Sequence, residues 1–108
     1  MLGLALKVGN LTLDTVARQV FVGDKPITVP AKELEVLEHL LRRSGKVVSR
    51  SLLEGGLYGP MQEIESNALE VHVHRLRRRL IEVGASVRVQ TVRGVGYMIS
   101  EVSWVSPD

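Results

Sequence analysis

The chain has 108 residues, a formal net charge of +2 and 44% hydrophobic residues. These values predict a single globular domain over residues 1–108 and argue against a disordered chain. No apolar run approaches the roughly 20 residues that a bilayer requires, so no membrane partner is expected. The absence of cysteine excludes thiolate catalysis, cysteine zinc sites and disulfide scaffolds. It also fits a reducing compartment, and we expect the protein in the cytoplasm.

The first part of the chain predicts a small antiparallel sheet. Segments 4–8, 11–14, 19–22 and 27–29 are short, rich in β-forming residues and separated by turn residues. Short strands with turns between them are typical of a four-stranded meander.

The hydrophobic period then becomes helical. Leucines recur at helical spacing between Ala31 and Arg43, with Pro30 suited to a helix start and Gly45 to its end. The charged side chains expected on the outer face of this helix are Glu33, Glu35, Glu38 and Arg42.

A second, shorter helix is expected to begin after Ser49, a good N-cap residue, and to end near Leu57. Gly59-Pro60 breaks it. Residues 58–65 are then expected to form a loop.

A third helix is expected from a cap at Ser66 or Asn67 to about Val83, with Gly84 as its stop. Its apolar residues form a narrow stripe of Leu69, Val73, Leu76, Leu80 and Val83. The opposite side carries Asn67, Val71, His74 and Arg78, with Arg75 beside them.

That outer face fits the major groove of B-DNA. Arginine can grip guanine, asparagine can read adenine, and an exposed aliphatic group can touch a thymine methyl. Val71 favours this interpretation, since it contributes nothing to a solvated face. The alternative is an ordinary surface helix with one outward valine.

The C-terminal part predicts a hairpin of residues 87–92 and 97–102 with Arg93 at its tip. A long cation on a narrow, glycine-rich finger suits insertion into a minor groove. The plainer explanation of Gly94 and Gly96 is that they supply positive φ for the turn, and both explanations can hold together.

The element order therefore predicts an α+β fold: a winged helix-turn-helix with an N-terminal four-stranded antiparallel sheet, three helices and a C-terminal hairpin wing. Its charge is uneven, because residues 75–93 hold six arginines against one acidic residue, Glu82. Such asymmetry is typical of a polyanion binder, although a solvated arginine-rich helix face would produce it too.

Nothing in the sequence indicates catalysis, a cofactor or a metal. His72 and His74 are two positions apart on a helix, so they point in different directions and cannot share an ion. They are better explained as groups near phosphates or bases, or as surface residues. No nucleophile signature is present, and we expect no enzyme.

Several motifs together resemble the OmpR/PhoB family, the winged helix-turn-helix effector domains of bacterial two-component response regulators. The segments that carry the resemblance are 34–41, 47–50, 71–77 and 91–97, and the run 66–74 resembles the PmrA/QseB-like branch. The resemblance covers residues 4–100.

The resemblance implies that the third helix is the recognition helix, with Asn67, Val71, His74 and Arg75 facing bases and Arg93 entering the minor groove. Residues 58–65 correspond to the loop that contacts RNA polymerase in activators of the family, here Tyr58, Gly59, Met61, Gln62, Glu63 and Glu65. Such domains bind direct repeats as head-to-tail pairs. A phosphorylated receiver domain, served by a sensor kinase, drives their pairing. The chain has no room for a receiver and is expected to be a fragment of a longer regulator.

We therefore expect sequence-specific binding of double-stranded DNA in transcription regulation. Phosphate contacts are expected from Lys46, Arg50, His72, Arg77, Arg78, Arg79 and Thr91. The main alternative is a winged-helix module that binds another protein and has no specific DNA site.

Overall fold

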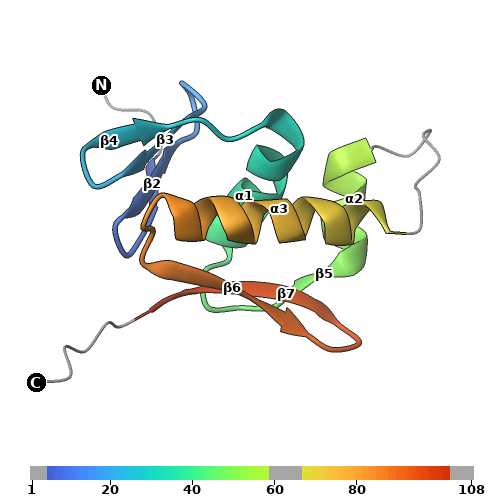
Figure 1. The fold of residues 1–108 in the computed structure, drawn as a ribbon. Coiled ribbons are helices and arrows are strands. Elements are labelled where there is room, and N and C mark those ends of the chain that lie inside the picture. Colours follow the sequence, from blue (N-terminus) through green and yellow to red (C-terminus); the bar gives the residue numbers. More distant parts are fainter. Residues whose placement is uncertain (1–4, 59–66, 103–108) are drawn as a thin grey trace, which may run out of the picture.

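The computed structural model describes residues 5–58 and 67–102, and it is an α+β fold of two small sheets around three helices (Figure 1). In chain order the elements are β1 (Ala5–Val8), β2 (Leu11–Asp14), β3 (Gln19–Val22), β4 (Lys25–Ile27), α1 (Ala31–Arg42), β5 (Val48–Ser49), α2 (Arg50–Tyr58), α3 (Ala68–Glu82), β6 (Val87–Val92) and β7 (Gly96–Glu101). The predicted fold class and element order are confirmed, with one added strand, β5.

The core lies where the helices meet both sheets. One sheet has the order β1-β2-β3-β4 and the other the order β5-β7-β6, with antiparallel neighbours throughout. In Figure 1, α3 runs across the molecule between the N-terminal sheet and the C-terminal hairpin. Its stripe of Leu69, Val73, Leu76 and Leu80 is buried, as predicted, together with leucines of α1. This packing turns the opposite face of α3 outward.

The fourth strand lies two residues earlier than predicted. Val22 pairs with Lys25, so Gly23 and Asp24 form a two-residue turn in which Gly23 has a φ of +60°. Pro26 is tolerated inside β4 because β4 is the edge strand of its sheet among the described residues, with β3 as its neighbour.

Glu33 is not on the outer face of α1, contrary to the prediction. It is 4% exposed, and its Oε1 accepts a hydrogen bond from Nε of Arg79 at 3.2 Å. The spacing of the leucines could not reveal this, because the partner lies on α3, 46 positions away. A carboxylate can be buried here because a guanidinium meets it.

The short strand β5 was not predicted, and it explains Gly96. Ser49 pairs with Gly96 and Val48 with Tyr97, and a Cβ on Gly96 would lie 1.9 Å from the Val48 carbonyl oxygen. Gly96 therefore serves close backbone approach and not positive φ, contrary to one explanation above. Gly94 alone of the two has the left-handed conformation, with a φ of +78°.

The start of α2 is as predicted, since the Ser49 hydroxyl accepts a hydrogen bond from the Leu52 amide at 3.1 Å. The end of α2 differs slightly, because Tyr58 is its last residue and not the first residue of a loop. The other residues expected to contact polymerase, Gly59, Met61, Gln62, Glu63 and Glu65, lie outside the described residues.

Hydrogen bonds of Asn10 join the N-terminal sheet to the segment that follows α3. Asn10, in the turn between β1 and β2, donates its backbone N–H to the Ser86 hydroxyl at 2.9 Å. Its side chain accepts from the Ser86 amide at 2.7 Å and donates to the Gly84 carbonyl at 3.1 Å. The N-terminal sheet is thereby fastened to the turn that leads from α3 into the wing.

Candidate nucleic-acid interface

The outward face of α3 carries the predicted base-reading side chains. Asn67, His74 and Arg75 are exposed, and Val71 is partly buried. Asn67 occupies the N-cap position, but its side chain makes no capping hydrogen bond. The face is therefore a row of polar groups with one aliphatic group, along the first two turns of the helix.

The wing turn lies beside this helix. Arg93, Gly94 and Val95 form a three-residue turn between the paired residues Val92 and Gly96, closed by a hydrogen bond from the Val95 amide to the Val92 carbonyl at 3.0 Å. Arg93 is exposed, as the prediction requires.

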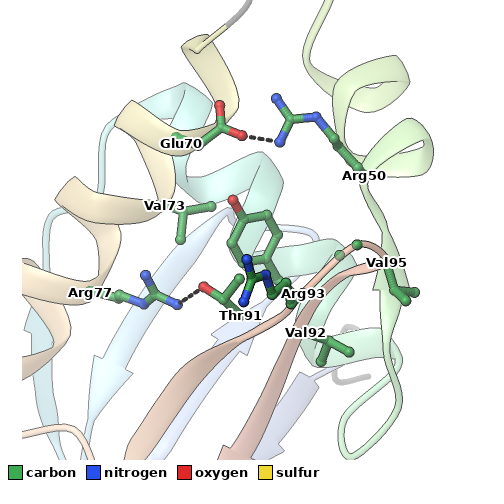
Figure 2. Close-up of a pocket in the computed structure, with 11 residues that line it drawn as sticks. Arg50, Glu70, Val73, Arg77, Thr91, Val92, Arg93 and Val95 are labelled. Atoms are coloured by element: carbon green, nitrogen blue, oxygen red, sulfur yellow. Dashed lines mark hydrogen bonds and ion pairs between the residues drawn. The ribbon is translucent and has the colours of Figure 1, made fainter.

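A cleft of about 500 Å³ separates α3 from the wing. Figure 2 shows two polar bridges along it, Arg50–Glu70 and Arg77–Thr91, with Val73 between them on α3. Arg93 lines the same cleft from the wing turn. The two elements predicted to read DNA thus face one shared hollow.

Arg77 fastens the helix to the wing. Its Nε donates to the Val89 carbonyl at 2.8 Å and its Nη2 to the Thr91 hydroxyl at 2.7 Å. Its guanidinium also lies 5.9 Å from the centroid of the Tyr97 ring, within cation–π range. Arg77 and Thr91, both expected near phosphates, are therefore in contact with each other.

Tyr97 is a residue of the cleft that the sequence analysis did not name. It is 6% exposed, and it is one of the residues that line the cleft. Tyr97 and Ile99 lie two positions apart on β7, so the sequence predicts that both side chains point to the same, inner face of the sheet. The position of Tyr97 at the cleft follows from the tertiary structure, in which β7 pairs with β5.

Arg50 joins three elements. Its guanidinium forms ion pairs with Glu54 of α2, at 3.2 Å, and with Glu70 of α3. Its backbone amide donates to the Val95 carbonyl of the wing turn at 3.1 Å. The hydrogen bond from Arg50 lowers the pKa of Glu70, and Glu70 in turn raises the pKa of Arg50. Both groups are therefore charged at neutral pH.

The remaining phosphate candidates lie in different surroundings. Lys46 and Arg78 are exposed, whereas Arg79 is paired with the buried Glu33. His72 is partly buried, and its Nδ1 has no hydrogen-bond partner in the described part of the chain. The structure thus brings Arg50, Arg77 and Thr91 to the cleft with Arg93, but it places Arg79 against α1.

These features define the class. A helix-turn-helix whose second helix presents a polar face beside a basic hairpin wing is a winged helix-turn-helix domain, a class of duplex DNA-binding domains. Within the described ranges, no helix has the length and apolarity needed to cross a membrane.

Comparison with known proteins identifies the family. Residues 24–99 match the family described as transcriptional regulatory protein, C terminal. The chain is 44% identical over 93 residues to the response regulator protein PmrA of Pseudomonas aeruginosa, covering 86% of this chain and 40% of that protein. It is 43% identical over 96 residues to the transcriptional regulatory protein QseB of Escherichia coli O157:H7, covering 89% and 42%. The chain thus spans less than half the length of these relatives.

A solved structure agrees. The RstA DNA-binding domain of Klebsiella pneumoniae, crystallised in complex with the RstA box, superimposes with a TM-score of 0.75 at 28% identity, covering 89% of this chain and 96% of that one. The chain belongs to the family of C-terminal DNA-binding domains of OmpR/PhoB-type transcriptional regulators, and its similarity to PmrA and QseB confirms the branch expected from the sequence.

Proposed function

We propose that this domain binds a specific duplex DNA site with α3 in the major groove and the wing turn in the minor groove. The observation that carries the proposal is the shared cleft, which α3 lines through Glu70, Val73 and Arg77 and the wing turn through Arg93. The four predicted base-reading side chains of α3 are not among the residues that line it. A helix and a wing turn with an arginine, lying on the two sides of one cleft, can reach adjacent grooves of one duplex.

Within this proposal, different side chains meet the bases and the phosphates. Base reading is assigned to the four side chains of α3 and to the wing cation: Asn67, Val71, His74, Arg75 and Arg93. Exposed cations such as Lys46 and Arg78 are suited to phosphates.

We further infer a role inside a longer regulator of the bacterial cytoplasm. Relatives more than twice as long, one of them named a response regulator, support a receiver domain and a sensor kinase as partners. Head-to-tail pairing on direct repeats, and contact of segment 58–65 with RNA polymerase, belong to the same proposal.

The experiment is selection of binding sites from a random duplex pool at about 0.15 M salt. Enrichment of a direct repeat, with half-sites about one helical turn apart, is the expected result. Unenriched DNA after several rounds would refute specific binding by this domain and favour a module that binds protein.

Arg75→Ala then tests the base-reading face. It is expected to cost about 1–3 kcal/mol on the selected site and to relax the preference at one base pair. Arg88→Ala is the matched control, because Arg88 is an exposed arginine on β6 that lies away from the wing turn. Equal losses on selected and random DNA for Arg75→Ala would remove its base-reading role.

A further inference from the structure

An acidic side chain lies on the surface proposed to meet DNA. Glu70 is in the first turn of α3, between the base-reading positions Asn67 and His74, and it lines the cleft opposite Arg93. Its side chain is 44% exposed. A carboxylate at this place repels phosphates, so its presence calls for a compensating role.

Glu70 forms an ion pair with Arg50, one of the arginines that line the cleft. The guanidinium of Arg50 is shared between Glu70 and Glu54, and these three side chains together carry a net charge of −1. The backbone of Arg50 is meanwhile held by the wing turn through Val95. The Arg50–Glu70 pair therefore couples α2, α3 and the wing at a single point.

We propose that Glu70 sets the specificity of DNA binding by holding the Arg50 guanidinium against α3. The ion pair keeps the Arg50 guanidinium from binding phosphates of any DNA sequence. It also fixes the position of the recognition helix relative to the wing. Sequence-independent affinity arises mainly from cations that release counterions from phosphates, so one restrained cation lowers it selectively. This inference rests on the proposed DNA binding and adds a positioning residue to it.

The test uses Glu70→Gln, which removes the charge and keeps the shape. The affinity for random duplex is expected to rise about fivefold at 0.15 M salt, and its salt dependence to steepen by about one unit, as for one added phosphate contact. The ratio of selected-site to random affinity is expected to fall. Glu38→Gln is the matched control, because Glu38 is likewise paired with arginines but lies on α1.

Two further variants show whether Glu70 works through Arg50. In an Arg50→Gln background, Glu70→Gln is expected to have at most a small effect on random duplex. Glu70→Asp keeps the charge but shortens the reach, so it is expected to resemble a weaker Glu70→Gln. Thermal unfolding of each variant checks that the domain stays folded.

Three results would overturn the inference. An undiminished effect of Glu70→Gln in the Arg50→Gln background, with a wild-type-like Glu70→Asp, would mean direct repulsion of phosphates. Equal losses on selected and random DNA would mean a structural role only. A changed preference at one base pair would mean that Glu70 reads a base. If no selected site exists, the proposed specific binding fails, yet the random-duplex measurements still test the hold on Arg50.

Discussion

The guanidinium of Arg77 donates to the hydroxyl of Thr91 and so ties α3 to β6. The same side chain reaches the Val89 carbonyl and the face of Tyr97. The helix α3 and the wing are thereby held as one unit in the absence of DNA. A preorganised pair of reading elements loses less conformational entropy on binding than two independent ones.

The first prediction concerns this contact. Thr91→Val removes the acceptor while keeping the shape, and it is expected to lower the free energy of unfolding by about 1 kcal/mol in urea denaturation. Thr28→Val is the control, because Thr28 is exposed and lies outside the helices and strands. Unchanged stability with weaker binding to every DNA sequence would instead assign the hydroxyl to a phosphate.

The second prediction concerns Arg79. Arg79→Ala leaves the carboxylate of Glu33 buried without this partner, and it is expected to cost about 2 kcal/mol of unfolding free energy. That is less than the 3–5 kcal/mol of a fully buried pair, because the Arg79 side chain is 33% exposed. The exposed neighbour Arg78 provides the control, since Arg78→Ala is expected to change stability by less than about 0.5 kcal/mol.

The outcome also decides the role of Arg79 in binding. If Arg79→Ala keeps the stability of the wild type but weakens binding to all duplexes alike, the predicted phosphate contact holds and the structural pair contributes little.

The third prediction concerns Gly96. An alanine there would drive its Cβ into the Val48 carbonyl, so β5 must move away from β7. A loss of about 1–3 kcal/mol is expected, as for other overpacked sites. Gly55→Ala is the contrasting variant, because nothing lies within 4 Å of a Cβ at that helical position. It is expected to gain up to about 1 kcal/mol. Equal thermal stability of the two variants would contradict the close approach of β5.

The fourth prediction concerns acid. Hydrogen bonds from Arg18 and Arg50 lower the pKa values of Glu38 and Glu70, respectively, from 4.5. A folded-state pKa below the unfolded value gives stability that is present at neutral pH and is lost as the pH falls below about 4.5. The effect is modest because the Arg50–Glu70 pair is exposed to solvent and the Glu38 side chain, 16% exposed, is still partly accessible.

Melting temperatures between pH 7 and pH 3 measure this loss. The double variant Glu38→Gln/Glu70→Gln is expected to lose less stability over that interval than the wild type does, and the difference should shrink in high salt. Parallel curves for the two proteins would show that neither ion pair stabilises the folded state.

Local patterns predicted most elements because each depends on neighbouring residues. The leucine spacing of α1, the Ser49 cap and the outward face of α3 follow from periods of 3.6 residues and from short-range hydrogen bonds. The strand β5 escaped prediction, since two residues carry no period and their partner β7 lies far along the chain.

The order of elements, the polar face of α3 and the cation at the wing tip all follow from patterns in the sequence. Which polar side chains meet depends on the packed fold. Arg50, Arg77 and Arg79 look alike in the sequence, yet they engage Glu70, Thr91 and Glu33, respectively. These partners lie 14 to 46 positions away. The physical reason is that hydrogen bonds need heavy atoms about 3 Å apart and that Coulomb attraction weakens with distance and is screened by salt within about 10 Å. Packing of the core, not spacing along the chain, sets those distances.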